Sequence, residues 1–418
     1  MNSVKKFTSE SEVEAELLSY APQRLTMGIV KLERIQALLK HVGNPQQALK
    51  VIHIAGTSGK TSTSYYVRAL LEASGAKTGL TVSPHIDTIR ERVQISGQPI
   101  PTDAFVQYFN DFYPLVDGFA PRPTYFELVT AFAFCLFQRE NVDYAVIETG
   151  LGGRLDATNT VDRLDKICVL TPIGYDHTEI LGDTLTKIAV EKAGIIGTGN
   201  VVFTTEQDPE AQVVIESAVH HKQATLKVIH SNIDPASDAP AFQQQNFSLA
   251  LEVVRYVAAR DGWQLLEDAQ NIFGQVHVPG RWELYRVGDK TVVLDGAHNP
   301  QKLAAFFEAT AQHGMSPAVV VAGLSEAPDD KIKQCVQIIS SHAAKTIYTT
   351  FEIQRDVTRK SVSLDALSEL VGGQHSEYIG EAAEALSLAL RSEELFVIVT
   401  GSLYLVSILR PLVQAIAE

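Results

Sequence analysis

The stretch HIAGTSGKTS, residues 53–62, decides the fold of the first part of this chain. It begins inside an apolar run, Val51–Ala55, and ends inside a stretch of helical character, Lys60–Ala73. A glycine-rich turn between a strand and a helix aims several backbone N–H groups and a helix N-terminus at one point, as a bound phosphate requires. The stretch therefore predicts a strand, a phosphate-binding loop and a helix, in that order.

The polar positions of this loop suit a nucleoside triphosphate. Gly56 and Gly59 let the backbone come close to the phosphates. Lys60 can reach the β and γ oxygens, and Thr61 can bind phosphate or support Mg²⁺. The full Walker A spacing would place glycine at position 54, where this chain has isoleucine, so the loop is a shortened variant. A glycine-rich turn with a surface lysine is the alternative, and the strand–turn–helix setting argues against it. The residues expected to contact ATP here are Gly56, Thr57, Ser58, Gly59, Lys60, Thr61 and Ser62.

Strands and helices alternate on both sides of this loop. Before it, helical spacing is kept by Ile29, Leu32, Ile35, Leu38 and Leu39, with Gly43 and Pro45 as a stop. After it, the strand candidates are Lys77–Val82, Tyr144–Glu148, Ile167–Thr171 and Val201–Thr204. The helical segments between them include a buried Leu128–Phe137, Thr184–Ala193 and Pro209–His220. This alternation predicts an α/β fold with a mostly parallel sheet covered by helices on both faces.

A second αβ series begins near Thr291. Its predicted strands are Val292–Asp295, Ala318–Ala322, Thr346–Thr349 and Leu395–Thr400. Its predicted helices are Gln301–His313, Asp330–His342, Glu381–Arg391 and Ser402–Ala417. The segment Gln275–Asp289, with its proline and glycines, is the predicted interdomain linker. We therefore expect two domains, 1–280 and 281–418, the second smaller and Rossmann-like but without the GxGxxG of a dinucleotide site.

Composition narrows the class of protein. The chain has 418 residues, 45% apolar and 20% charged, so neither disorder nor a coiled coil describes it as a whole. With 35 basic and 49 acidic residues its net charge is −14, which argues against a nucleic-acid partner. Its three cysteines, Cys135, Cys168 and Cys335, form no CxxC pair, as in a protein of the reducing cytosol. The N-terminus has no apolar signal core, and no apolar stretch spans a bilayer, so we expect a cytoplasmic protein without a membrane partner.

Three candidate magnesium ligands follow strand candidates. Glu148 ends an apolar strand, His177 comes soon after the next strand, and Ser83 follows another. In a parallel sheet these strand ends converge on one crevice, so the three side chains could meet around one or two Mg²⁺ ions. Taken singly, each has an ordinary explanation: a turn serine, a surface histidine and a structural acid.

The chain resembles the folylpolyglutamate synthase/dihydrofolate synthase family of the Mur ligase superfamily. The stretches that carry the resemblance are HIAGTSGKTST, TVSPHIDTIRERVQI, PTYFELVTAFAF, VIETGLGGRLDATNTVD, DHTEILGDTLTKIAVEKAGII, PGRWE, VVLDGAHNP and VTGSLYL. They cover nearly the whole chain, from about residue 28 to 410. The resemblance implies a P-loop Mur-ligase-like central domain followed by a smaller Rossmann-like domain that binds glutamate. It also implies an ATP-dependent acid–amino-acid ligase that phosphorylates a carboxylate and lets the amine of glutamate attack the acyl phosphate.

The resemblance assigns roles to individual residues. Ser83 and Glu148 would hold a first Mg²⁺, and Glu148 and His177 a second. Lys192 matches a lysine that the family carbamylates, although sequence alone would describe it as a solvated helix lysine. Further matches are Asn246 for adenine, Arg281 and Asp295 for ATP, and His298 and Ser402 for the glutamate side. Ser402 would also serve as a helix N-cap. The residues expected to act in catalysis are Lys60, Lys192, Asp295 and His298.

The same resemblance points to a pterin site. In bifunctional members the loop LGGRLDATN, residues 151–159, and the segment TYFE build it, with Phe126 stacked on the ring and Asp156 accepting hydrogen bonds from it. Arg154 belongs to the same loop, and a buried core phenylalanine is the ordinary alternative for Phe126. Two loop positions depart from the family's GTNGKG wording, Ser58 and Thr61, which weakens any inference about the substrate from this loop alone.

Several functions remain open from sequence. The favoured one is a monomeric, bifunctional enzyme acting on ATP, L-glutamate, dihydropteroate and tetrahydrofolate. A polyglutamylating enzyme alone, or another Mur-type amino-acid ligase, is the nearest alternative. A ligase for UDP-linked peptides would need an N-terminal domain larger than the roughly fifty residues before the loop. A non-catalytic P-loop regulator would be expected to lose Glu148, His177 or Lys192, and no NKxD-type motif of a GTPase is found.

Overall fold

The computed structural model describes residues 5–22, 32–234, 236–265, 269–355, 358–371 and 376–417. The chain forms two compact units, Met1–Val276 and His277–Glu418. The boundary expected near residue 280 therefore lies close to the start of the second unit. Ile29, used above to predict an N-terminal helix, lies outside the described residues.

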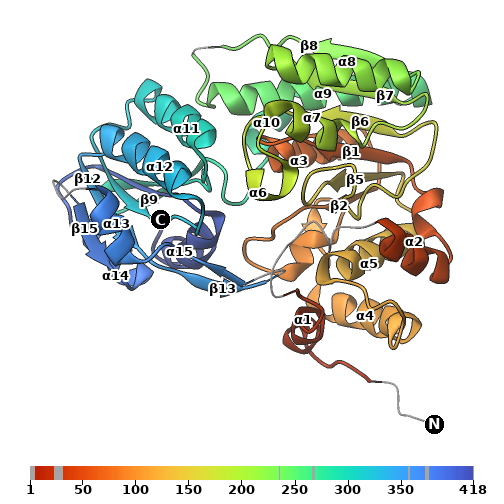
Figure 1. Ribbon diagram of the computed structural model, residues 1–418, viewed down its shortest axis with the longest axis horizontal. Helices are drawn as coiled ribbons and strands as arrows, with labels where there is room; N and C mark the ends of the chain where they lie inside the picture. The colour runs from red at the N-terminus through yellow and green to blue at the C-terminus, as the bar shows by residue number, and fades with distance from the viewer. Residues whose placement is uncertain are drawn as a thin grey trace. The chain divides into compact units, whose positions relative to one another are not determined.

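The first unit is built on an eight-stranded sheet with the order β4-β3-β2-β5-β1-β6-β7-β8 (Figure 1). Six strands are parallel: β1 (Val51–Ala55), β2 (Thr78–Thr81), β5 (Tyr144–Glu148), β6 (Ile167–Leu170), β7 (Val201–Thr205) and β8 (Thr225–Ile229). An antiparallel pair, β3 (Gln94–Ile95) and β4 (Gln98–Pro99), extends one edge. The α/β prediction is confirmed. Strand β1 lies between β5 and β6, where the direction of winding changes, and this is where such sheets bind ligands.

Helices cover both faces of this sheet. The helices of this unit are α1 (Glu10–Leu18), α2 (Leu32–His41), α3 (Lys60–Ala73), α4 (Thr102–Val116), α5 (Tyr125–Arg139), α6 (Thr178–Leu181), α7 (Leu185–Ala193), α8 (Pro209–His221), α9 (Ala241–Asp261) and α10 (Ala269–Gln275), with 3₁₀ turns Pro45–Ala48 and Ile89–Arg92. Val51 packs in one core with α2 and α5, and Ala55 packs in another with α7 and α8. Side chains alternate along a strand, so Ile52 and Ile54, both 0% exposed, face the opposite side, where α3 and α9 pack.

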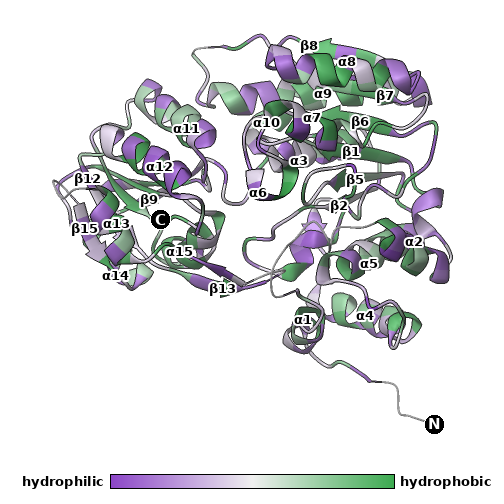
Figure 2. Ribbon diagram, in the orientation of Figure 1, coloured by the Kyte–Doolittle hydropathy of each residue, from purple (hydrophilic) through white to green (hydrophobic). Residues whose placement is uncertain are grey.

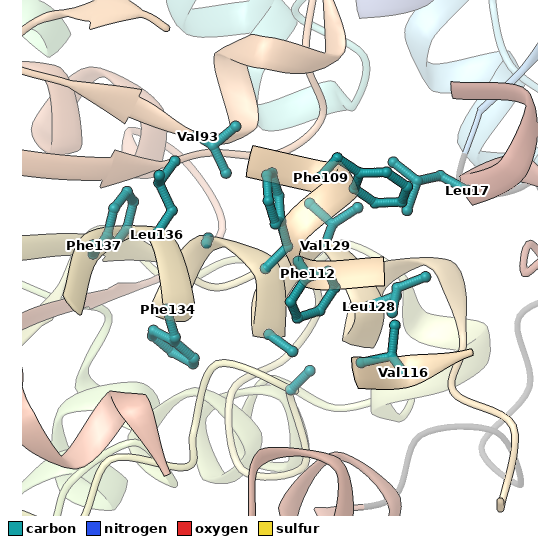
Figure 3. Close-up of a cluster of buried hydrophobic side chains, with 14 of the residues drawn as sticks. Leu17, Val93, Phe109, Phe112, Val116, Leu128, Val129, Phe134, Leu136 and Phe137 are labelled. Atoms are coloured by element: carbon teal, nitrogen blue, oxygen red, sulfur yellow. The ribbon is translucent and has the colours of Figure 1, made fainter. Parts of the chain in front are cut away.

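The core beside α4 and α5 contains several phenylalanine rings packed among leucine and valine side chains (Figure 3). Phe132 of α5 meets Phe105 and Phe109 of α4 edge to face, with ring centroids 5.8 and 5.6 Å apart. Such pairs add to the stabilisation from burial alone. The predicted buried helix at Leu128–Phe137 is confirmed, as the central part of α5. Apolar residues also line the central strands in Figure 2. Among the described helices, none is both long and apolar enough to cross a membrane.

The second unit has a six-stranded sheet with the order β15-β12-β11-β16-β10-β9. Its strands are β9 (Glu283–Val287), β10 (Lys290–Leu294), β11 (Ala318–Ala322), β12 (Lys345–Thr349), β15 (Ser376–Ile379) and β16 (Phe396–Thr400). A small hairpin joins β13 (Glu352–Gln354) to β14 (Thr358–Lys360). The helices are α11 (Pro300–Gln312), α12 (Asp329–His342), α13 (Leu364–Val371), α14 (Ala382–Leu390) and α15 (Leu403–Ile416). All of these strands but β9 run parallel in the main sheet, as predicted for a Rossmann-like unit.

The prediction that Gln275–Asp289 is a linker is wrong for the last part of this segment. Glu283–Val287 forms β9, which pairs antiparallel with β10 through a tight turn at Gly288. The strand was missed because it is an edge strand in which the charged residues Glu283 and Arg286 are interspersed with Leu284, Tyr285 and Val287, so it shows no apolar run.

A buried ion pair fastens β9 to the last helix. Glu283 is 2% exposed and accepts hydrogen bonds from Arg410 Nε at 2.9 Å and from the Gly280 N–H at 2.8 Å. Burial alone would raise the pKa of Glu283, but His277 and Arg410 outweigh it and lower the pKa from 4.5 to about 2. A carboxyl whose pKa is depressed in the folded state stabilises the protein above its unfolded pKa, and this contribution is lost as the pH falls below about 4.5 toward 2.

We therefore expect Glu283→Gln to lower the free energy of unfolding by about 3 kcal/mol at pH 7 and by about 2 kcal/mol at pH 3.5. The measurement is urea unfolding at both pH values. The chain has two tryptophans, so Trp263→Phe leaves Trp282 as the fluorescent reporter of the second unit. Glu384→Gln, at an exposed position of α14, is the control and should change neither value by more than a few tenths of a kcal/mol. A difference between Glu283→Gln and the parent that is equal at both pH values would contradict this account.

Candidate active site

The phosphate loop is held in place by the segment that follows β6. Gly56 has φ +150°, and a Cβ there would lie 1.9 Å from Thr171 Oγ1, so only glycine fits. The Thr57 N–H donates to Pro172 O at 2.9 Å, and the Thr57 hydroxyl donates to Gly174 O at 3.0 Å. The loop is thus tied to the neighbouring strand end before any ligand binds.

Two lysines converge on the carbonyl of Gly56. Lys60 Nζ, from the first turn of α3, lies 3.1 Å from it, and Lys192 Nζ, from the last turn of α7, lies 2.9 Å from it. Lys192 is only 4% exposed, so the description of it as a solvated helix lysine is wrong. Two ammonium groups beside one glycine-rich turn concentrate positive charge locally in an acidic chain, as a polyphosphate site requires.

Asn246 lies against the same loop. It belongs to the second turn of α9, is 5% exposed, and its Oδ1 would be 2.2 Å from a Cβ placed on Gly59. Gly59 has φ +85° and caps α3, so both the backbone conformation and this approach exclude a larger residue. Residues nearly two hundred positions apart are therefore in contact at the helix N-terminus that carries Lys60.

Glu148 is the centre of the predicted magnesium site. Its carboxylate is 3% exposed; Oε1 accepts a hydrogen bond from the Thr61 hydroxyl at 3.0 Å, and Oε2 lies 3.4 Å from the Ser83 N–H. His177 is the N-cap of α6 and has φ 50°, and its Nδ1 lies 3.7 Å from Glu179 Oε1. The structure thus brings together Ser83, Glu148 and Thr61, whereas the His177 imidazole lies beside Glu179. In the described part of the chain, no group of three or more His, Cys, Asp or Glu side chains could hold a metal; the predicted set has only two such side chains.

The loop 151–159 is organised around Asp156. This carboxylate is 3% exposed and accepts hydrogen bonds from the Leu151 N–H at 2.8 Å, the Thr158 N–H at 3.0 Å and the Thr158 hydroxyl at 2.5 Å. Burial raises the pKa of Asp156, against these hydrogen bonds. Asp156 therefore stabilises its own loop, and its contact with a pterin stays a prediction. Phe126 is half-buried, and its ring packs on Gly150, where a Cβ would lie 2.5 Å from Cζ.

The same loop packs on the end of α7. Arg154 donates two hydrogen bonds to Glu191 Oε1, at 3.0 and 2.7 Å, while its own side chain is 53% exposed. Gly153 and Gly194 allow the close approach, since a Cβ on Gly153 would lie 2.7 Å from Glu191 O and one on Gly194 would lie 2.3 Å from the Arg154 Cβ. The loop of the predicted pterin site is therefore in contact with the helical turn that carries Lys192.

In the second unit, Asp295 follows β10 and is 5% exposed. It accepts hydrogen bonds from the Trp282 N–H at 2.9 Å and the Ala297 N–H at 2.8 Å. Burial raises the pKa of Asp295, while the charge of Arg281 opposes this shift. The predicted residues Arg281 and Asp295 thus lie together.

His298 and Ser402 lie at the ends of the neighbouring strands β10 and β16. His298 Nδ1 lies 2.7 Å from Gly296 O, and Lys302 Nζ lies 3.1 Å from His298 Nε2. An ammonium group can only donate, so Nε2 accepts and Nδ1 carries the proton. Ser402, 1% exposed, accepts from the Tyr404 N–H at 3.1 Å and caps α15, so its helix-capping role is confirmed.

Sequence reasoning missed three residues beside these sites. Lys302 lies one helical turn beyond His298, a spacing that could have indicated the contact. His53 and Thr158 form a buried hydrogen bond of 2.8 Å between β1 and the loop 151–159. A histidine inside an otherwise apolar strand was the available signal.

A mostly parallel sheet with a phosphate loop at its switch point, Lys60 and Lys192 beside the Gly56 carbonyl, and a smaller α/β unit after it define a P-loop ligase of the Mur type. The family models agree: the Mur ligase middle domain matches residues 54–278, and the Mur ligase glutamate ligase domain matches residues 280–403. Dihydrofolate synthase/folylpolyglutamate synthase of Bacillus subtilis is 30% identical over 424 residues, covering 94% of this chain and 97% of that protein.

Solved structures agree along the full length. Folylpolyglutamate synthase of Mycobacterium tuberculosis complexed with ADP is 29% identical, with a TM-score of 0.82 over 96% of this chain and 98% of that one. FolC of E. coli in complex with DHPP and ADP is 25% identical, with a TM-score of 0.83 over 98% of both chains. The chain belongs to the folylpolyglutamate synthase/dihydrofolate synthase family of Mur ligases. It is an ATP-dependent, amide-forming ligase.

Proposed function

We propose that this chain ligates L-glutamate to dihydropteroate, and then to the γ-carboxylate of folates, through an acyl phosphate made with ATP. The B. subtilis relative bears both activities in its name and aligns with 94% of this chain. The observation that carries the proposal is the convergence of Lys60 and Lys192 on Gly56, beside a loop, residues 151–159, that packs on the end of α7. Phosphate binding and acceptor binding would then share one edge of the first sheet.

Different residues would bind the phosphates and the adenine of ATP. Lys60 would leave the Gly56 carbonyl for the β and γ oxygens, and Asn246, already against Gly59, would contact adenine. Arg281 and Asp295 of the second unit would add contacts to the nucleotide. His298 and Ser402, at the ends of β10 and β16, would bind glutamate. The working unit would be one chain.

Magnesium fits the residues around Glu148. A buried carboxylate that faces the Thr61 hydroxyl and the backbone of Ser83 offers hard oxygen donors beside the phosphate loop, which is the donor set Mg²⁺ prefers. Ser83 and Glu148 would hold a first ion, and Glu148 and His177 a second. Bound Mg²⁺ would neutralise the charge that develops on the transferred phosphoryl group.

Lys192 would act as a carbamate. Its Nζ is buried against the phosphate loop, and carbamylation would turn this cation into an anion able to organise metal and acyl phosphate. The pterin would stack on Phe126 and face Asp156, with Arg154 at the rim of the loop. Polyglutamylation of folates alone is the competing function. It differs from the proposal only in lacking the ligation of glutamate to dihydropteroate.

The deciding experiment is an ADP-release assay with ATP, glutamate, Mg²⁺ and bicarbonate, offering dihydropteroate and tetrahydrofolate separately. Release with both acceptors is the expected result. ADP release with tetrahydrofolate alone would refute the dihydrofolate synthase activity. The absence of ADP release with either acceptor would refute the whole proposal.

A further inference from the structure

A buried hydrogen-bond chain links the strand that carries the phosphate loop to the loop that carries Asp156. His53 Nε2 lies 2.8 Å from Thr158 Oγ1, and Thr158 Oγ1 lies 2.5 Å from Asp156 Oδ1. The three residues are 0%, 2% and 3% exposed. His53 and Thr158 are 105 positions apart in sequence, so this contact exists only in the folded sheet.

The donors and acceptors in this series of hydrogen bonds follow from the number of protons that the three side chains carry. Both oxygens of Asp156 accept a backbone N–H, from Leu151 and from Thr158, as in an ionised carboxylate. A carboxylate can only accept, so the single hydroxyl proton of Thr158 goes to Asp156, and the Thr158 oxygen must then accept from His53 Nε2–H. His53 is neutral, since burial and, less strongly, the charge of Lys166 lower its pKa well below the usual range. Its Nδ1 is buried and has no hydrogen-bond partner among the described residues. In a neutral imidazole only one nitrogen carries a proton, so an unprotonated Nδ1 goes with a protonated Nε2, which donates to Thr158.

The hydrogen bonds from Thr158 fix the position of one oxygen of Asp156. Oδ1 accepts from both the hydroxyl and the N–H of Thr158, whereas Oδ2 accepts from the Leu151 N–H at 2.8 Å. Rotation of the carboxylate would break hydrogen bonds to an ionised group, which contribute more than neutral ones. The lone pairs of the Asp156 carboxylate that are not used within the loop, and could accept from a ligand, therefore point in one fixed direction.

We propose that Thr158 and His53 are positioning residues for the pterin ring: they fix the orientation in which Asp156 presents its carboxylate to the ring's N–H groups. The inference rests on the proposed function, in which the loop 151–159 carries the pterin site. Neither residue would touch the substrate, and both would act through Asp156.

The first test compares Thr158→Val, which removes the hydroxyl at equal volume, with Thr158→Ser, which keeps it. In steady-state assays we expect Thr158→Val to raise the KM for dihydropteroate about tenfold, as the loss of a hydrogen bond to a charged group does. The KM of Thr158→Ser for dihydropteroate should stay within about twofold of that of the parent. The KM for ATP should not change in either variant, because the phosphate loop keeps its own contacts.

The second test does not depend on Thr158. His53→Gln retains an amide N–H that can donate to Thr158, whereas His53→Leu retains volume and loses the donor. We expect His53→Leu to raise the KM for dihydropteroate severalfold and His53→Gln to restore most of the difference. Tm is measured for all four variants, since a merely structural role would lower Tm and kcat without changing the ratio of the two KM values.

The outcomes separate the inference from the proposed function. A parent enzyme that turns over dihydropteroate, with unchanged KM in Thr158→Val and His53→Leu, would overturn the inference alone. A parent that releases no ADP with dihydropteroate would refute the synthase activity, and the positioning role with it. Raised KM for dihydropteroate in the two donor-deficient variants, with KM for ATP constant, would support both.

Discussion

Replacing Lys192 by alanine is expected to lower turnover at least about a hundredfold, because it removes a charged group held 2.9 Å from the phosphate loop. Short carboxylates such as formate or acetate should restore part of the activity, since they can occupy the vacated space and supply the anion of the carbamate. The measurement is ADP release under Mg²⁺ and bicarbonate, with and without added carboxylate.

Two further variants separate the possible roles of this lysine. Lys192→Arg keeps a cation that can donate to Gly56 but cannot be carbamylated; we expect it to be as inactive as the alanine variant. Lys187→Ala changes a lysine of the same helix whose side chain is 61% exposed, and it should leave turnover unchanged. Full activity of Lys192→Arg would show that positive charge, not carbamate, is what the site needs. Turnover of Lys192→Ala close to that of the parent would refute any catalytic role.

Gly59→Ala is expected to lower kcat/KM for ATP about a hundredfold or more. The new Cβ would lie 2.2 Å from Asn246 Oδ1, so the loop, Asn246 or the start of α3 must move. Displacements of this size at a phosphate-positioning loop are costly for transfer reactions. The measurement is the ATP dependence of ADP release, together with direct binding of ADP.

The matched control lies at the other end of the same helix. Gly75 has φ +92°, close to the φ of +85° at Gly59, but nothing lies within 4 Å of a Cβ placed there. Gly75→Ala therefore carries the same backbone strain, about 1 kcal/mol of stability, without the contact. We expect a slightly lower Tm and unchanged kcat/KM for ATP. Equal losses of activity in both variants would show that strain, and not the approach of Asn246, causes the effect.

Much of the fold could be predicted from sequence, and the reason is local. Val51–Ala55 and Lys60–Ala73 were predicted as strand and helix with the bounds that the structure has, because apolar periodicity and glycine turns are properties of neighbouring residues. Strand β9 was missed for the same reason: its stability comes from pairing with β10 and from the Glu283–Arg410 ion pair, not from its own pattern.

The sequence by itself determined the class of this protein: a strand–loop–helix phosphate site, two αβ series and a set of motifs that define one family of ligases. Only the tertiary structure decided which predicted residues meet. Asn246 against Gly59, Lys192 on the carbonyl of Gly56, Thr61 on Glu148 and His53 on Thr158 each join distant segments. Such contacts depend on the order of the strands and on the packing of helices over them, and no local pattern encodes either. Sequence offered two descriptions of Lys192, a solvated helix lysine and the family's carbamylated lysine; its burial beside the phosphate loop rules out the first.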